Sequence, residues 1–570
     1  MIEKNIPKYY IVVSAKAHAA EKYAAANIQK YVYKSTGVCY PLINDSISPL
    51  SNEILVGFNA RNVGKTLEIP DIGNEGYVIK TVKNGVVIGG NTPRGTLYGA
   101  FAFLRKTVGF ECYTKDVEKV DTVTDFTVPE LDIAEKPEFE YRDAFFRNAF
   151  DEEFCVKNGL NTSSAYISER KGGSERFYTI GHTFNTLLPP DKYFNSHPEY
   201  FSLINGERQP DQPCLTNPEV YEIIKKNLFK QIEENPECRI FSVAQNDVDV
   251  CCECPECKAI NEREESASGT NIYFVNKLAK EVKKRFPNVL LHTFAYRFTR
   301  KAPKTLKPDD NVIVRLCNIE CDWSEPFPSL VKNGNESAIE FDKNLREWGK
   351  ITKRLYVWDY AVNFHNYLLP FPCVYQMAEN IKYYKERGVV GVFEQGNYTL
   401  GGGAALDDLK SYLTAKTLWN TETDVENTVT EFCDRVYGKG GKYIKEYIDI
   451  ITAAVKGYRL TLYDKPSAPY LTDELAEKCN ELFEKALWVA ENKQVYERIE
   501  REKLSVDYMR IVRIEDEKER VRQTNAFAEK LAKYGINEIS EMAALEDSLN
   551  FMRYSRFAED RFPRYDYLRF

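Results

Sequence analysis

Acidic side chains recur directly after short apolar segments in the middle of the chain. Asp247, Asp359 and Glu394 each follow such a segment within three residues. If these segments are the strands of a parallel barrel, the acids gather at one mouth, because the reacting groups of such barrels lie at the carboxyl ends of the strands. Gathered carboxylates repel one another, and burial raises the pKa of at least one of them, so that it stays protonated near neutral pH. Glycoside cleavage needs such an acid to protonate the leaving oxygen, and a second group to stabilise positive charge on the sugar ring.

We therefore expect the catalytic residues to be Glu394, Asp247 and Asp359. The alternative for any one acid is a structural ion pair with an arginine at a strand end, because such pairs also perturb carboxylates. The arginines in question are Arg142, Arg147 and Arg315.

Polar and aromatic residues near these acids are candidates for holding a sugar. An aromatic ring can form the flat apolar floor of a subsite, and a histidine at a strand end can hydrogen-bond a hydroxyl group. The alternatives are barrel packing for the rings and a satisfied structural histidine. The candidate substrate-binding residues are Asn246, His182, Trp358, Tyr360, Glu320, Trp323 and Tyr398.

A group of cysteines follows Asp247. Cys254 and Cys257 have the two-residue spacing that lets two thiolates reach one zinc ion, and Cys252 adds a third ligand, with Cys214 as a speculative fourth. These cysteines could bind a structural zinc ion or form a local disulfide, and the alternative is that they are free thiols in a loop. The expected chemistry requires no cofactor. The other cysteines among the 14 are scattered and are expected to be free core thiols.

The elements that must position these groups form an α/β protein. We predict a small N-terminal α/β domain over 1–130, a central (β/α)8 TIM barrel over 131–435 and a C-terminal helical region over 436–570. An Asn84-Gly85 turn predicts a hairpin in the first domain. The predicted barrel strands are Arg142–Asn148, Arg176–Thr183, Tyr200–Ile204 or the segment around Cys214, Arg239–Ala244, Val289–Tyr296, Val312–Asn318, Leu355–Trp358 and Val389–Phe393.

Composition excludes several classes of partner. The net charge of −8 leaves no basic stripe for nucleic acid, and no segment is long and apolar enough for a membrane span. The first residues lack the pattern of a signal peptide, which predicts a cytoplasmic location. A homodimer through the helical region is compatible with the sequence.

Six motifs carry a resemblance to a known family: Gly181–Asn185, His197–Phe201, Cys214–Pro218, Gln245–Asp247 with Cys252–Cys257, Trp358–Tyr360 and Phe393–Gly396. Together they resemble a bacterial family first described as a domain of unknown function and later grouped as glycoside hydrolase family 163. The segments Arg94–Gly99 and Gly109–Tyr113 are similar to the domain that precedes the barrel in family 20 hexosaminidases and family 67 α-glucuronidases.

The resemblance implies an endo-β-N-acetylglucosaminidase that acts on N-glycan-type oligosaccharides, in which the acetamido oxygen of the substrate attacks the anomeric carbon. It implies Glu394 or Asp247 as the acid/base and Asn246, Asp359 and Tyr360 as candidates for holding the acetamide. One alternative is an α-glucuronidase-like or other exo-glycosidase with an inverting carboxylate pair, Asp359 or Glu394 as base and Asp247 as acid. A second alternative is a carbohydrate-binding protein without catalysis.

Overall fold

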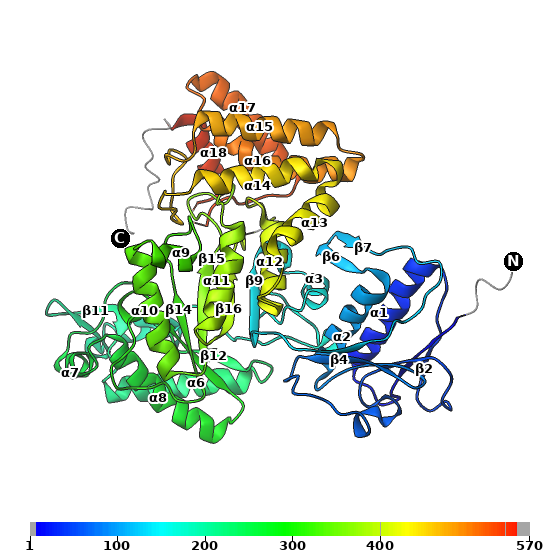
Figure 1. Cartoon of the computed structure of the whole chain (residues 1–570). Coiled ribbons are helices and arrows are strands. Elements are labelled where there is room, and N and C mark those ends of the chain that lie inside the picture. The colour runs from blue at the N-terminus through cyan, green and yellow to red at the C-terminus, as the bar shows by residue number, and fades with distance from the viewer. Residues whose placement is uncertain (1–6, 400, 542, 556–570) are drawn as a thin grey trace.

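The computed structural model describes residues 7–399, 401–541 and 543–555. It has three regions along the chain (Figure 1): an N-terminal α/β domain in blue, a central barrel from cyan to yellow-green, and a set of long helices from yellow to red. The expected α/β class, with a barrel between an α/β domain and helices, is confirmed.

The N-terminal domain is a six-stranded sheet with two helices packed together. The sheet order is β2-β1-β3-β5-β4-β8, and the hairpin at Asn84-Gly85 joins β4 to β5 as predicted. Thr92 caps the second helix by accepting a hydrogen bond from Gly95 N, and Gly109 ends it in the left-handed conformation. The elements are β1 (Tyr10–Val13), α1 (Ala19–Thr36), β2 (Leu42–Asn44), β3 (Glu53–Val56), β4 (Tyr77–Val82), β5 (Gly85–Gly90), α2 (Pro93–Val108), β6 (Glu111–Thr114), β7 (Val117–Lys119) and β8 (Asp132–Glu135).

The central region is a parallel sheet with helices outside it. Its strands run in the order β12-β13-β14-β15-β16-β9, so the last strand along the chain pairs with the first and the sheet curves toward closure. The strands are β9 (Tyr141–Phe145), β12 (Ile240–Ser242), β13 (Leu290–Ala295), β14 (Val312–Cys317), β15 (Leu355–Tyr360) and β16 (Val389–Gln395). The helices are α3 (Glu152–Lys157), α4 (Phe184–Leu187), α5 (Pro190–Tyr193), α6 (Pro218–Glu234), α7 (Pro255–Arg263), α8 (Ser268–Arg285), α9 (Phe327–Lys332), α10 (Glu336–Ile351), α11 (Val374–Glu386) and α12 (Asp407–Trp419).

Two irregular segments fill the wall between β9 and β12. Asn161 is tied to β9 by the bond from Arg142 N to its Oδ1 (2.9 Å), and its carbonyl accepts from Glu175 N (2.9 Å). The second segment reaches β12 through an isolated parallel bridge from Phe177 to Ile240. The six strands of the parallel sheet and these two segments together occupy the eight strand positions of a (β/α)8 barrel.

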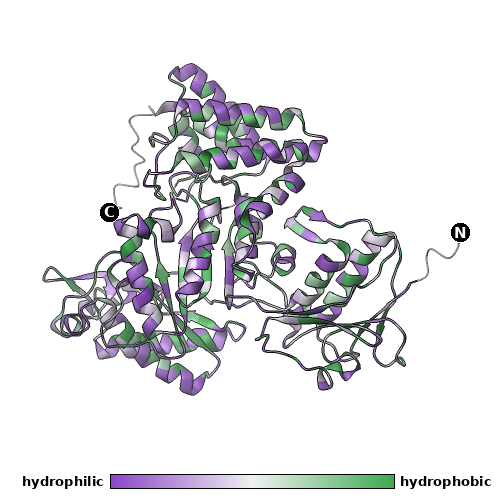
Figure 2. Ribbon diagram, viewed as in Figure 1, coloured by the Kyte–Doolittle hydropathy of each residue, from purple (hydrophilic) through white to green (hydrophobic). Residues whose placement is uncertain are grey.

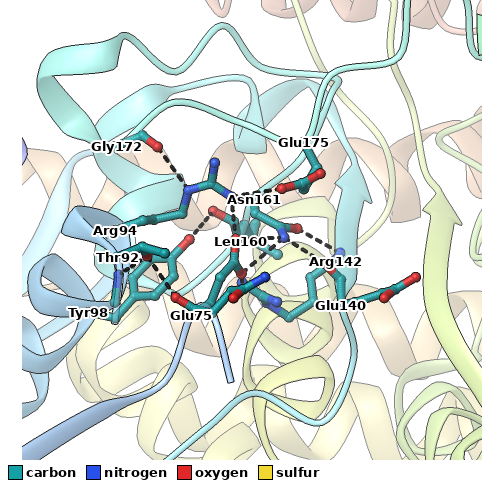
Figure 3. Close-up of polar contacts among 12 residues, drawn as sticks. Glu75, Thr92, Arg94, Tyr98, Glu140, Arg142, Leu160, Asn161, Gly172 and Glu175 are labelled. Atoms are coloured by element: carbon teal, nitrogen blue, oxygen red, sulfur yellow. Dashed lines mark hydrogen bonds and ion pairs between the residues drawn. The ribbon is translucent and has the colours of Figure 1, made fainter. Parts of the chain in front are cut away.

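A buried ionic network holds this irregular wall against the N-terminal domain (Figure 3). Glu75, from the loop before β4, binds Arg94 and Asn161 and accepts from Arg142 Nη2 at 2.5 Å. Arg142 also donates to the carbonyl of Gly159 at 2.7 Å. Charged groups removed from water are stable only when paired in this way. The N-terminal domain therefore supports the barrel where regular strand pairing is missing.

The third predicted barrel strand is wrong. Residues Phe201–Ile204 form β10, which pairs antiparallel with β11 (Glu207–Pro213) in a separate hairpin outside the barrel. Asn205-Gly206 supplies the turn, and both residues adopt positive φ. The apolar pattern of β10 correctly predicts a strand, but the strand belongs to a separate two-stranded sheet.

The C-terminal region consists of helices, among them the amphipathic α13 and α14, and it packs on the carboxyl ends of the barrel strands (Figure 2). Backbone bonds join the loops after β14 and β15 to this region, including Phe364 N to Leu462 O (2.7 Å) and Tyr367 N to Ile539 O (2.8 Å). In the described residues, no helix combines the length and apolar character that crossing a membrane demands. The helices are α13 (Val425–Tyr437), α14 (Gly441–Ala454), α15 (Asp473–Trp488), α16 (Lys493–Ile511), α17 (Glu517–Lys533) and α18 (Leu545–Tyr554).

Candidate active site

The mouth of the barrel is the carboxyl-terminal end of its strands together with the loops that follow them. Side chains alternate along each strand between the barrel interior and the helix layer. Tyr141, Tyr356 and Phe393 share one interior cluster, with Trp358 packed against it. The residues between them face the helices, so this alternation decides which of the predicted side chains reach the mouth.

Asp247 lies at the mouth after β12, with its side chain 57% exposed. The hydroxyl of Tyr296, at the end of β13, donates to its Oδ1 at 3.1 Å. His182 faces the same oxygen across 3.9 Å, while its Nδ1 lies 2.5 Å from the carbonyl of Gln245 and must carry the proton of that bond. Asp247 is therefore an accessible carboxylate with a fixed orientation.

Arg297 completes this side of the mouth. Its Nε donates to the Tyr296 hydroxyl at 2.9 Å, and its Nη2 lies 3.9 Å from Asp247. The backbone of Arg297 has φ +49°, a conformation that non-glycine residues rarely adopt and that clusters at functional sites.

A second carboxylate reaches the mouth from the C-terminal region. Glu541 accepts a hydrogen bond of 3.0 Å from the hydroxyl of Tyr398, which lies in the loop after β16. Burial raises the pKa of Glu541; the bond from Tyr398 opposes this rise, and the charge of Asp247 adds to it. The site thus pairs an accessible carboxylate with a more buried carboxyl group whose pKa is raised.

Aromatic rings line the interior below these acids. Trp358 is half-buried and lies 4.4 Å from Phe393 and 5.6 Å from Phe294, between ring centroids. Its indole Nε1 donates to Gln395 at 2.7 Å. Tyr398 stacks on Phe145 at 5.1 Å. Apolar faces with a few fixed polar groups are what a sugar-binding surface requires.

Glu394 and Asp359 lie outside this mouth. They occupy paired positions on β16 and β15 and face the helix layer, where both are fully buried. Asp359 accepts from Tyr384 of α11 at 2.6 Å, and Lys410 of α12 lies near Glu394. The expectation that these two acids point into the mouth is therefore corrected, because strand alternation turns them to the opposite face.

Glu394 is held as a neutral acid. Burial raises its pKa well above the ordinary value, the charge of Asp359 raises it further, and Lys410 only partly opposes both. Neither carboxyl oxygen has a hydrogen-bond partner within the described part of the chain. Such a group prefers protonation to an unpaired buried charge.

We expect the substitution Glu394→Gln to leave glycosidase activity within about threefold of wild type, because an amide imitates a neutral acid that does not touch substrate. Between the ordinary pKa of Glu394 in the unfolded chain and its raised pKa in the folded protein, the folded state holds a proton that the unfolded state has lost. The free energy of unfolding of the wild type therefore falls as pH rises through this range. The variant has no titrating group at this position, so it does not lose stability in this way. The melting temperature of the variant relative to that of wild type should therefore rise from pH 5 to pH 8. Thermal unfolding of both proteins across this pH range measures the difference. The control is Glu379→Gln, a change at an exposed position on α11. Loss of activity in Glu394→Gln would show that Glu394 is a catalytic residue after all.

The other predicted substrate-binding residues divide between the mouth and the framework. Tyr360 faces the mouth interior, and Glu320 lies at its rim in an ion pair of 2.6 Å with Arg300. Trp323 is buried and donates to Asp359 at 3.3 Å. Asn246 is buried as well, and its Nδ2 donates to the carbonyl of Asp211 (2.7 Å) and to Asn185 (2.8 Å). Asn246 and Trp323 thus support the site from behind.

Sequence reasoning missed Glu541, Arg297 and Tyr296 as members of this site. Arg297 and Tyr296 stand at a predicted strand end, so the rule that selected the acids would have found them had it included basic and phenolic groups. Glu541 lies in the segment Ile539-Ser540-Glu541 after α17, far beyond the last barrel strand in the sequence, where no strand-end pattern marks it. Its role follows only from the packing of the C-terminal region.

The predicted cysteines form a compact cluster beside the mouth. Cys214, Cys252, Cys254 and Cys257 are buried, and their sulfur atoms all lie within 4.8 Å of one another. All four are free thiols, so the local disulfide is not formed. The cluster has the composition and size to hold a structural metal ion such as zinc.

Sequence comparison matches two family models to the chain. The model of DUF4838, described as a domain of unknown function, matches residues 112–449. The model described as the N-terminus of glycosyl hydrolase family 67 matches residues 4–103, which confirms the predicted likeness of the first domain to that of family 67. No curated protein matches the sequence.

Solved structures of the glycoside hydrolase families GH115, GH138 and GH84 are similar to the chain. A 4-O-methyl-α-glucuronidase of family GH115, specific for decorated arabinogalactans, matches with a TM-score of 0.58 and 11% identity over 93% of this chain and 76% of its own. A GH138 enzyme that targets pectin rhamnogalacturonan II has a TM-score of 0.43 and 10% sequence identity over 92% of this chain and 74% of its own. A GH84 structure, CpGH84B, has a TM-score of 0.42 and 13% sequence identity over 95% of this chain and 96% of its own. The first of these shows that the chain has a glycoside-hydrolase-like fold.

Proposed function

This chain belongs to the DUF4838 family, and we propose that it is a glycoside hydrolase whose site is the barrel mouth between Asp247 and Glu541. The observation that carries the proposal is the pairing of two carboxylates in unlike environments. Asp247 is exposed beside Arg297, whereas burial raises the pKa of Glu541 and the charge of Asp247 adds to this rise. A carboxyl group with a raised pKa is suited to the acid role, and an exposed carboxylate beside it is suited to stabilising charge.

We further propose an endo-β-N-acetylglucosaminidase-like reaction on N-glycan-type oligosaccharides, as the family 163 resemblance implies. Glu541 donates its proton to the glycosidic oxygen as the bond to the anomeric carbon breaks. The acetamido oxygen of the sugar attacks that carbon, and Asp247 accepts the acetamide N–H and stabilises the charge that develops. Water then opens the cyclic intermediate while Glu541 takes back a proton, which restores the enzyme.

The fixed geometry around Asp247 supports this role. An acetamide must be held in one orientation for its oxygen to attack, and Tyr296 and Arg297 hold the carboxylate that would orient it. Trp358 and Tyr360 lie in the same interior and offer ring faces to the sugar. These groups come from the ends of three different strands, β12, β13 and β15, as expected for a barrel enzyme.

A second candidate, α-glucuronide hydrolysis, is favoured by one observation. Arg297 at the mouth is suited to pair with the carboxylate of a uronic acid, because a guanidinium binds a carboxylate through two parallel hydrogen bonds. The GH115 structure similar to this chain is an α-glucuronidase. In this case Asp247 and Glu541 would act as base and acid of an inverting pair.

The test is hydrolysis of aryl β-N-acetylglucosaminides, aryl α-glucuronides and released N-glycans, followed by proton NMR of the first anomer formed. Cleavage between the two core N-acetylglucosamines with retention of configuration supports the first candidate. Cleavage of glucuronides with inversion selects the second. Glycan binding without turnover of any substrate overturns the enzymatic proposal and leaves a carbohydrate-binding protein.

A further inference from the structure

We propose that Cys214, Cys252, Cys254 and Cys257 bind one structural zinc ion that anchors the loop bearing Asp247. The four sulfurs come from two segments far apart in sequence. Cys214 directly follows β11, and the other three lie between β12 and the first turn of α7. One ion at their centre therefore joins the β10–β11 hairpin to the segment that leaves the barrel mouth.

The sulfur geometry fits a tetrahedral zinc site. With zinc–sulfur bonds of about 2.3 Å, a tetrahedron places its sulfurs about 3.8 Å apart. The Sγ atoms of Cys214 and Cys254 lie 3.7 Å apart, and all four lie within 4.8 Å. A disulfide needs about 2.05 Å, so the thiols surround a centre and do not pair.

The surroundings of the sulfurs suit thiolate ligands. The backbone N–H of Leu203 points at Cys252 Sγ at 3.3 Å, and the hydroxyl of Thr216 lies 3.2 Å from Cys257 Sγ. Arg208 interacts with Cys214 and brings a positive charge close to the cluster. Binding displaces the thiol protons to solvent, and four thiolates around Zn²⁺ carry a net charge of −2, which these donors and Arg208 offset.

The proposed ion lies next to the bonds that fix the start of the Asp247 loop. Asn246 N donates to Gln212 Oε1 at 3.0 Å, and Gln212 Nε2 donates back to the Asn246 carbonyl at 3.0 Å. Gln212 lies on β11, two residues before Cys214, which directly follows that strand. Glu253 N also donates to Leu203 O at 2.8 Å. The zinc and these bonds together hold both ends of the loop that carries Asp247.

Zinc is favoured over iron because a thiolate site binds zinc more tightly than ferrous iron in the general order of divalent metals. The test is metal analysis by mass spectrometry of the full-length protein purified without chelators. We expect about one zinc per chain in wild type and in Cys251→Ser, and less than about one tenth in Cys214→Ser. Cys251 is the matched control because it precedes Cys252 in sequence and lies outside the cluster.

A second measurement covers the case in which Cys214→Ser fails to fold. Titration of folded wild type with a mercurial reagent in the presence of a chromogenic zinc chelator should release one zinc ion as four thiols react. After release, limited proteolysis should cut within 247–253 before other sites. One iron per chain, or no metal with four thiols open to alkylation, overturns the proposal, and neither readout depends on the enzymatic function.

Discussion

Asp247→Asn is expected to lower kcat on the cleaved substrate by about 10³-fold with little change in melting temperature. Asparagine keeps the shape and can still accept from Tyr296, but it removes the negative charge that the proposal uses at the transition state. The half-exposed position explains why folding should survive the change. The measurement is steady-state kinetics on the best substrate of the panel.

Asp249→Asn is the matched control for this experiment. Asp249 is exposed in the same loop and lies two residues further along. We expect its substitution to leave kcat within about twofold of wild type, as for most surface changes. Equal losses in both variants would trace the effect to the loop as a whole, and full activity in Asp247→Asn would remove this residue from the mechanism.

The sequence predicts the fold correctly where local patterns are strong. Strands such as Val312–Cys317 are continuous apolar segments between helices, and the structure places them within a residue of prediction. The wall between β9 and β12 escaped prediction because Asn161 and Phe177 sit in segments held by side-chain bonds and the Glu75 network. Such pairing depends on a distant domain and leaves no local periodicity.

The candidate site was readable in part for a related reason. Strand ends identified Asp247, His182 and Trp358, because carboxyl ends of parallel strands meet at one mouth. The same rule also selected Glu394 and Asp359, and it failed there because a shift of one residue along a strand moves a side chain to the other face. Phe393 and Glu394 show this directly, one inside the barrel and the other against α12.

Glu541→Gln is expected to lower kcat by roughly 10²- to 10⁴-fold on substrates with a poor leaving group, because the amide cannot donate a proton to the glycosidic oxygen. Aryl glycosides with an acidic leaving group should be much less affected, since their departing oxygen needs little protonation. The measurement compares kcat for the two classes of leaving group. Glu538→Gln, on the same segment, is the control, and equal losses for both classes would argue against an acid role.

The pH profile gives an independent test of Glu541 through Tyr398→Phe. As the acid, Glu541 must be protonated, so activity falls as pH rises through its raised pKa. The Tyr398 hydroxyl donates to the carboxylate and stabilises its ionised form, which lowers that pKa. Phenylalanine keeps the stacking on Phe145 and removes only this bond, so the pKa should rise and the basic limb of kcat/KM should move to higher pH. A limb that stays in place would mean that Glu541 does not control it, and a shift to lower pH would contradict the sign of the interaction.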